Sequence, residues 1–366
     1  MKIRNNLSVL LALLLFTPIV HAESKLKPAG LPNYQPDTII IKDMSDEFFI
    51  IDVQWFLGYQ YKEVDGDDFN LFQIKRGYLN FQTDLNDKFS ARITPDITQD
   101  KEGDGKGDIE LRLKYLYLKY KFNSNAILSR PVLVFGLNQR PWIDFEQHIN
   151  PYRVQGRMFA ERSRILNSAD FGVTFTSLLG GGMSETYQKK VNDKEPGRYG
   201  SIALGVYNGG GYHAIEENEN KTFETRITLR PLPDFLPGFQ VSYTGAYGKG
   251  NISASPDFYF NNVFFSMQQE YFTATSQYMW GTGNSSGSYD ELPYTGHSFF
   301  ANAYIPNTKF ELFGRYDRFN LGSEGDVSER SSFIGGVAYS IVGKSKLLLD
   351  IDHTIMDNAA GSSETT

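Results

Sequence analysis

The residues best suited to bind a small solute are five arginines in one short segment, residues 139–168. They are Arg140, Arg153, Arg157, Arg162 and Arg164. The segment has no lysine and three acids, Asp144, Glu146 and Glu161, so its formal charge is +2, whereas the whole chain carries −7. A guanidinium group stays charged and presents a planar fork of donors that matches phosphate or carboxylate. The segment therefore has the composition of a site for small anions.

A second group of arginines lies in segments where apolar and polar residues alternate. These are Arg76, Arg92, Arg112, Arg226 and Arg315. By parity they project to the same face as the other polar residues, so with the loop arginines they could form a cationic track. The alternative is that they pair with acids on that face and brace it, because ionisable residues at membrane depth usually pair with one another. The candidate acids are Asp96, Glu110, Glu224, Glu311 and Asp317. The sequence leaves both interpretations open.

Alternation with a period of two predicts the elements that carry these arginines. In residues 222–230, for example, Phe223, Ile227 and Leu229 oppose Glu224 and Arg226. Such patterns predict strands at 47–62, 71–85, 89–98, 109–122, 131–138, 169–178, 198–208, 221–232, 238–248, 256–261, 263–280, 297–305, 309–319, 331–341 and 346–356. The pattern of residues 109–122 changes phase near Tyr115, which predicts a β-bulge there.

The connections between these strands alternate in length. Short ones (86–88, 306–308, 342–345) alternate with longer acidic or glycine-rich ones that begin near Asp65, Asp100, Gly209 and Gly322. Short turns at one end and longer loops at the other are typical of an outer-membrane β-barrel. Residues 139–168 fit neither a clean strand nor a clean helix, and we expect them to fold into the barrel as a constriction loop. Its aromatic residues would hold it against the wall: Trp142, Phe145, Tyr152 and Phe159.

The first 22 residues have the pattern of a secretory signal peptide. Lys2 and Arg4 precede an apolar stretch, and Val20-His21-Ala22 predicts cleavage near Ala22. A retained anchor is the alternative, although the apolar run is short for a bilayer. Residues 23–46 are then a periplasmic lead-in and residues 47–366 the barrel domain. Fifteen strands is an odd number, and because bacterial barrels have even numbers, a closing sixteenth strand is missing or the count is wrong by one.

Composition argues against other classes of function. Removing residues 1–22 leaves 34 Lys and Arg against 43 Asp and Glu, a net charge of −9, so nucleic acid is not an expected partner. The chain has no cysteine, and its histidines show no metal spacing. Residues 100–108 lack the EF-hand pattern, so a solvated loop is favoured over a calcium site. Ser163 and His148 share one loop without a G-x-S-x-G motif, which disfavours a hydrolase. We expect no enzyme, no cofactor and no metal.

Several segments resemble the phosphate-selective porin O and P family of Gram-negative outer membranes. The best matches are residues 75–93, 134–142, 158–173, 199–211, 225–232 and 310–319, and the run around Glu161 and Arg162 is the most specific. The resemblance implies a sixteen-stranded barrel, usually a homotrimer, with an inward constriction loop. Two features depart from the family pattern: no terminal aromatic strand is present, and the chain is not especially basic.

Together these observations predict an all-β protein, a transmembrane antiparallel β-barrel of sixteen strands with an inward constriction loop. The predicted function is an outer-membrane porin for passive diffusion of small hydrophilic solutes, with anion or phosphate selectivity from the arginines. Its partners would be outer-membrane lipids, small anionic or hydrophilic solutes and, from the resemblance, two further copies of the chain. The alternative is a structural or binding barrel, such as an adhesin or assembly component, whose lumen is closed.

Overall fold

A computed structural model describes residues 4–12, 39–42, 48–64, 66–100, 105–323 and 326–357. Within these ranges no helix is both long and apolar enough to cross a membrane. The strands and helices, in chain order, are β1 (Arg4–Ala12), β2 (Ile39–Lys42), β3 (Phe48–Val64), β4 (Asp67–Asp84), β5 (Phe89–Gln99), β6 (Ile109–Lys121), β7 (Leu128–Gln139), α1 (Pro141–Ile149), α2 (Phe159–Arg162), β8 (Ala169–Leu179), α3 (Glu185–Lys190), β9 (Gly200–Tyr207), β10 (Thr222–Leu229), β11 (Phe239–Lys249), β12 (Asp257–Gln268), β13 (Phe272–Thr282), β14 (Pro293–Tyr304), β15 (Phe310–Ser323), β16 (Asp326–Val342) and β17 (Ser345–Asp357).

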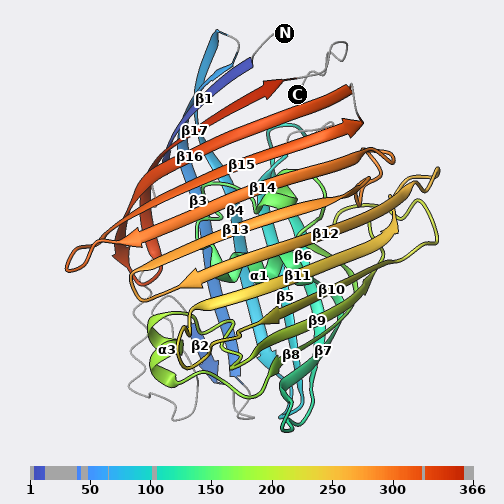
Figure 1. Ribbon diagram of the computed structural model, residues 1–366, viewed down its shortest axis with the longest axis vertical. Helices are drawn as coiled ribbons and strands as arrows, with labels where there is room; N and C mark the ends of the chain where they lie inside the picture. The colour runs from blue at the N-terminus through green and yellow to red at the C-terminus, as the bar shows by residue number, and fades with distance from the viewer. Residues whose placement is uncertain are drawn as a thin grey trace.

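The strands form one antiparallel sheet that returns to its own beginning. Each strand from β3 to β17 pairs with the next in sequence, and β1 pairs with both β17 and β3, so these strands make a ring of sixteen. The short strand β2 pairs with the first four residues of β3. In Figure 1, β1 lies beside β17, and α1 lies behind β11 to β13, within the ring. The protein is therefore a transmembrane β-barrel with a helix-containing loop inside it.

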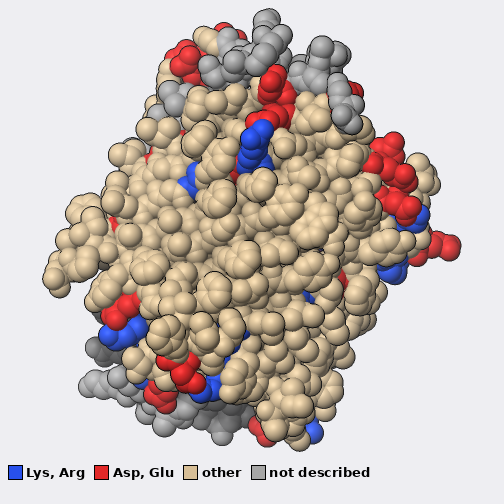
Figure 2. All heavy atoms as spheres, viewed as in Figure 1, with Lys and Arg blue, Asp and Glu red and all other residues tan. Residues whose placement is uncertain are grey.

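The two faces of the wall differ as the alternation predicts. Along β10, Phe223, Ile227 and Leu229 are exposed on the outside, whereas Glu224 and Arg226 are buried inside. Figure 2 shows that the outer surface over β12 to β16 is a broad area almost free of charged residues, with acids and bases gathered towards its ends. Such a surface suits hydrocarbon, and placing the polar side chains inside removes them from it.

All fifteen strands predicted from residue 47 onward correspond to β3 to β17. One turn was placed wrongly: the predicted break near residue 262 lies inside β12, and the turn follows Gln268. The break was placed at Asn262, but Asn262 is buried on the inner face, and its neighbour Asn261 accepts a hydrogen bond from the Tyr243 hydroxyl on the outside (2.7 Å). Polar residues inside a barrel strand need not mark a turn, because one face of the wall is polar.

The predicted irregularity near Tyr115 is confirmed as a bulge in β6. On β5, Thr94 pairs with Tyr115 and Pro95 with Leu113, so Lys114 has no opposite residue. Pro95 lacks a backbone N–H, which makes it suited to a position where the ladder is interrupted. The extra residue reverses the alternation, and both Lys114 and Tyr115 are buried on the inner face.

A second bulge, in β4, was not predicted. Phe56 of β3 pairs with Arg76 and Leu57 with Ile74, so Lys75 is the extra residue. The Lys75 ammonium donates to the backbone oxygens of Val154 and Gln155 in the constriction loop. Both bulges therefore add a lysine to the inner face of the wall.

Several loop predictions need correction. The long outer loops expected near Asp65 and Gly322 are short connections, because β3 runs to Val64 before β4 begins at Asp67, and β15 runs to Ser323 before β16 begins at Asp326. Residues 139–168, which showed no regular pattern, contain the helices α1 and α2. Pro141 occupies the first turn of α1, where its missing N–H costs nothing.

The predicted signal peptide overlaps the described residues only in part. Arg4–Ala12 form β1, which occupies the sixteenth position between β17 and β3. The predicted cleavage position at Ala22 and most of the lead-in, residues 23–46, lie outside the described residues, as does the chain after Asp357.

Candidate functional site

The constriction loop is anchored at its first residue by a buried ion pair. Arg140 is fully buried, and its Nε donates to Glu224 Oε2 of β10 (2.7 Å). The second oxygen of Glu224 accepts a hydrogen bond from the Trp142 backbone N–H (2.9 Å), and Asp170 of β8 lies 3.8 Å from Arg140. One carboxylate thus holds both the arginine and the first turn of α1. Arg140 fixes the loop and is not available to a solute.

Aromatic residues pack the loop against one side of the barrel interior. The ring of Trp142 lies 5.1 Å from that of Phe264 on β12 in an edge-to-face arrangement, and Phe145 lies 6.1 Å from the same ring. Tyr152 stacks on Phe313 of β15 at 4.2 Å. Phe159 is fully buried in the same apolar cluster as Trp142. The predicted role of these aromatic residues, to hold the loop against the wall, agrees with these contacts.

Four of the other nine predicted arginines have carboxylate partners. Arg153 forms a bidentate pair with Glu161 (2.8 and 3.0 Å), Arg162 pairs with Asp352 (2.9 Å), and Arg315 with Asp317 (2.8 Å); Arg112 lies 3.3 Å from Asp96. Arg226 bonds instead to the hydroxyls of Ser201 and Thr228 and lies over the Phe145 ring. The four carboxylate pairs agree with the bracing interpretation. Glu311, one of the candidate acids, pairs with Lys346 rather than with an arginine.

Besides Arg226, four predicted arginines have no acidic partner within the described residues: Arg76, Arg92, Arg157 and Arg164. Arg76 donates to the Tyr78 hydroxyl (3.1 Å), and Arg92 donates to Thr94 Oγ1 (2.9 Å) and to Asn80. The side chains of Arg157 and Arg164 are exposed. We refer to Lys75, Arg76, Arg92, Arg112 and Lys114 of β4 to β6, together with Arg157, as the basic face.

A second loop reaches the basic face. Residues 208–221, between β9 and β10, were expected to form an outer loop, but the Tyr212 hydroxyl donates to Asp96 Oδ2 of β5 (3.1 Å). The Lys114 ammonium lies over the Tyr212 ring, 4.4 Å from its centre, and donates to Ser168 Oγ at the end of the constriction loop (2.6 Å). Lys114 thus connects the wall, the constriction loop and this second loop.

The protonation behaviour of loop residues reflects the excess of positive charge. Burial would raise the pKa of Glu161, but Arg153 and Lys114 outweigh it and lower that pKa to about 2. The pKa of His213, next to Tyr212, is lowered by burial and then by the charges of Arg112, Lys114 and their neighbours. Glu161 is therefore ionised and His213 neutral near pH 7. His213 thus adds no charge to the basic face, whereas the guanidinium groups of its arginines stay charged.

Sequence reasoning missed Lys75, Lys114 and Tyr212. Strict alternation placed Lys75 on the lipid face next to the inward-facing Arg76, and a lysine facing lipid is costly enough to be a sign of a bulge. Lys114 lies at the phase change that was noticed, and its direction follows once the bulge is accepted. Tyr212 carried no signal, because nothing local distinguishes a loop that bends inward from one that faces water.

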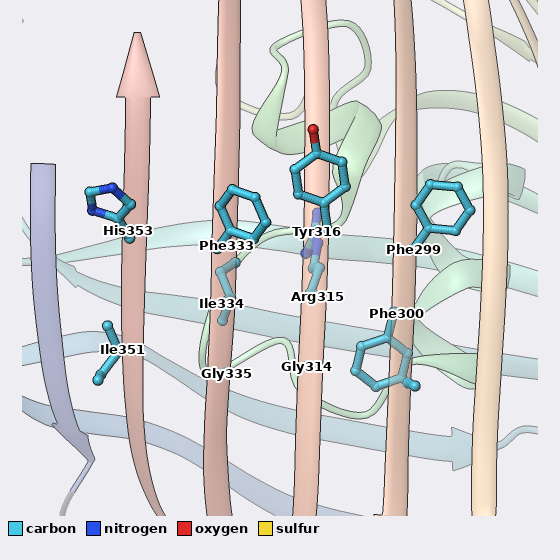
Figure 3. A pocket seen from close by; sticks show the side chains of 11 residues that line it. Phe299, Phe300, Gly314, Arg315, Tyr316, Phe333, Ile334, Gly335, Ile351 and His353 are labelled. Carbon is cyan, nitrogen blue, oxygen red and sulfur yellow. The ribbon is translucent and has the colours of Figure 1, made fainter. Parts of the chain in front are cut away.

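The outer wall also has a shallow groove, on the side opposite to Arg315. Its floor contains Gly314 and Gly335, and Figure 3 shows the rings of Phe299, Tyr316 and Phe333 on the near side of their strands, with Arg315 behind its strand. The groove belongs to the membrane-facing surface and takes no part in the interior. No group of three or more His, Asp or Glu side chains within the described ranges could hold a metal ion.

Comparison with known proteins agrees with this architecture. The family model for phosphate-selective porin O and P matches residues 49–130, from β3 into β7, which confirms the resemblance over that part of the chain. No curated protein sequence matches significantly. Among solved structures, OmpT of Vibrio cholerae is 10% identical with a TM-score of 0.51, covering 87% of this chain and 99% of its own. The outer membrane channel DcaP of Acinetobacter baumannii is 11% identical with a TM-score of 0.50, covering 97% of this chain and 94% of its own. These likenesses show the porin barrel fold.

Proposed function

We propose that this barrel is an outer-membrane porin for passive diffusion of small hydrophilic solutes, and that its constriction favours anions. The observation that carries the proposal is the basic face. On one side of the interior, Arg76, Arg92 and Arg157 have no acidic partner among the described residues, and two bulges add Lys75 and Lys114. The family match over residues 49–130 and the porin fold favour a channel over an enzyme.

The position of the loop favours a path along the basic face. The apolar side chains of α1 and α2 pack on β11 to β15, so that side of the interior is filled by the loop itself. The opposite side presents polar and charged groups. A solute that crosses a narrow place must exchange part of its hydration shell for contacts with the wall. Fixed guanidinium groups make that exchange more favourable for an anion than for a cation.

Only part of the predicted arginine set contributes to this preference. A paired arginine adds little net charge, so Arg140, Arg153, Arg162 and Arg315 would shape the loop and wall. The anion preference would come from Arg76, Arg92 and Arg157, with Arg164 in the loop as a further exposed cation. Phosphate is the ligand that the family name suggests, and a small carboxylate would use the same donors.

The proposal includes the cellular setting. The chain would be exported by its N-terminal signal with cleavage near Ala22, would reside among outer-membrane lipids and would assemble as a homotrimer. Cleavage there would remove β1 from its position between β17 and β3, so the mature barrel would need another strand at that position. The support is the signal-like composition of residues 1–22, the apolar outer surface in Figure 2 and the family match.

A barrel with a closed lumen is the second candidate. The observation in its favour is that three segments enter the interior: the constriction loop, the loop that carries Tyr212, and the segment after β8. In the last of these, Glu195 accepts a hydrogen bond from His148 of α1 (3.0 Å). If these segments leave no continuous water path, the protein would serve as a binding or structural barrel.

Reconstitution of the purified full-length protein into a planar bilayer separates the two candidates. A porin gives stepwise increases in current, and under a salt gradient the reversal potential gives the sign of the selectivity. We expect steps and a reversal potential of the anion-selective sign. Correctly folded protein that inserts without current steps would support the closed barrel, and cation selectivity would reject the anion-favouring constriction.

A further inference from the structure

Glu146 is a carboxyl group buried in the contact between the constriction loop and the wall. Glu146 lies on α1 and is only 4% exposed, and its Oε1 accepts a hydrogen bond from Gln277 Nε2 of β13 (2.6 Å). Gln277 is 3% exposed. Trp142 and Phe145 of the same helix lie in the apolar cluster between loop and wall. The pair is therefore a polar contact inside an otherwise apolar interface.

The contact leaves one oxygen on each partner unsatisfied. Glu146 Oε2 and Gln277 Oε1 are both buried, and neither has a hydrogen-bond partner within the described residues. Both atoms are acceptors if the carboxyl group is ionised, so neither can satisfy the other. Buried polar atoms without a partner are uncommon and costly. The defect lies on the two side chains that already share one hydrogen bond.

One proton removes both defects. If Glu146 is protonated, its Oε2–H can donate to Gln277 Oε1 while Gln277 Nε2 continues to donate to Glu146 Oε1. We propose that Glu146 and Gln277 form such a cyclic acid–amide pair, a proton-dependent latch between the constriction loop and β13. The latch makes Glu146 a positioning residue for the loop, which is a role beyond conduction itself.

The neighbouring charges do not replace the proton. On β15, Arg315 and Asp317 face Glu146, but they are paired with each other (2.8 Å), and Arg315 also donates to the Arg157 backbone oxygen. The Phe159 backbone N–H of α2 points towards the carboxyl group and favours its ionised form, but its geometry gives Oε2 no hydrogen bond within the described residues. Burial is the largest influence, and it raises the pKa of Glu146 to about 7 in spite of Arg315.

The remaining titratable groups near α1 are engaged elsewhere. On β10, Glu224 is held by Arg140, and Arg226 by Ser201 and Thr228. On α1 itself, His148 contacts Glu195. Asp144 is about two-fifths exposed (39%) and lies 3.9 Å from His148. It therefore offers a matched acid on the same helix that lacks the buried environment.

Difference infrared spectroscopy of the folded barrel in detergent tests the latch without using conduction. A protonated carboxyl group has a carbonyl stretch that a carboxylate lacks. We expect this band in the wild type at about pH 5, its loss by about pH 9 and a midpoint near pH 7. The component of this band that comes from Glu146 should be absent at every pH in Glu146→Gln, whose amide can make the same two hydrogen bonds permanently. Asp144→Asn should retain the wild-type band and midpoint.

A second variant distinguishes a shared proton from a buried acid that merely stays neutral. In Gln277→Leu the carboxyl group loses its partner, so its band should move to the higher frequency of a free acid. The inference is overturned if no band depends on Glu146 at any pH, or if Gln277→Leu leaves its frequency unchanged. Because none of these readings is a current, they are independent of whether the barrel proves to be a porin.

Discussion

Replacing Arg157 by glutamine is the most direct test of the proposed anion preference. Arg157 is exposed and has no acidic partner among the described residues, and only its backbone oxygen is used, by Arg315. The substitution therefore removes one net positive charge without leaving an acid unpaired. The fold should not change, because the side chain makes no contact on which the loop packing depends.

The expected size follows from Coulomb's law. An anion that passes about 6 Å from a unit charge, with an effective dielectric constant of roughly 40 to 80, gains about 0.7 to 1.4 kcal/mol. Salt at about 0.1 M roughly halves this at that distance. The remaining energy corresponds to a two- to threefold change, roughly, in the population of anions at the constriction. The effect should grow as the salt is diluted, because screening weakens.

The assay is the reversal potential of single channels under a salt gradient, at about 0.1 M and at about 0.01 M ionic strength. We expect Arg157→Gln to shift it towards cation selectivity, more at low salt, and Arg157→Lys to remain near wild type. The matched control is a double variant that carries both Arg162→Gln and Asp352→Asn. That change deletes a paired arginine without altering the net charge, so the reversal potential should stay where it is.

Two results would refute the reasoning. An unchanged reversal potential in Arg157→Gln at both salt concentrations would mean that the permeating ion does not pass near this residue. An equal shift in the charge-neutral double variant would mean that the number of arginines, rather than the net charge, determines selectivity.

Further predictions concern the anchoring of the loops and the effect of pH. Trp142→Ala should destabilise the barrel by about 3 to 5 kcal/mol through the cavity it leaves, measured by urea unfolding in detergent. Glu224→Gln removes the closer of the two carboxylates from the buried Arg140 and leaves only Asp170, at 3.8 Å. It should lower the free energy of unfolding by about 3 kcal/mol in the same assay; a loss below about 1 kcal/mol would reject the anchor. Tyr212→Ala should release the second loop and increase the single-channel conductance. Tyr212→Phe removes only the hydroxyl hydrogen bond, so it should lower the free energy of unfolding by about 1 kcal/mol. Because the pKa of Glu146 is raised from 4.5 to about 7 in the folded barrel, its contribution to stability is complete below about pH 4.5 and is lost as pH rises to about 7. The total loss of about 3 kcal/mol should be absent in Glu146→Gln, and parallel curves for the two proteins would contradict the raised pKa.

The sequence allowed the wall to be predicted because a barrel strand lies between two different solvents. Lipid outside and polar groups inside impose a period of two, and this is why β10 could be located to within three residues at either end. The period of two gave wrong predictions where a strand departs from strict alternation or where a polar residue lies in the middle of a strand. Lys75 sits at a bulge that shifts the alternation by one residue, and Asn262 lies in a strand whose inner face is polar.

The ion pairs of the site residues could not be predicted either, and the reason is a different one. Arg140 and Glu224 are 84 residues apart, and Arg162 and Asp352 are 190 apart. Their contact depends on how far the loop enters the barrel and which wall it meets. The residue types therefore identified the chemistry, but only the fold distinguished an arginine that braces the loop from one that faces water.

The two bulges also bear on how barrels of this kind can vary. Deleting a residue from the middle of a strand normally turns everything beyond it inside out, because each side chain moves to the opposite face. Lys75 and Lys114 are exceptions, since the residues on either side of each already pair as if the lysine were absent. A one-residue deletion at either position would remove an inward cation and leave the hydrogen-bond ladder regular. Insertions and deletions within strands are thus a route by which the charge of a channel can diverge between relatives while its wall is preserved.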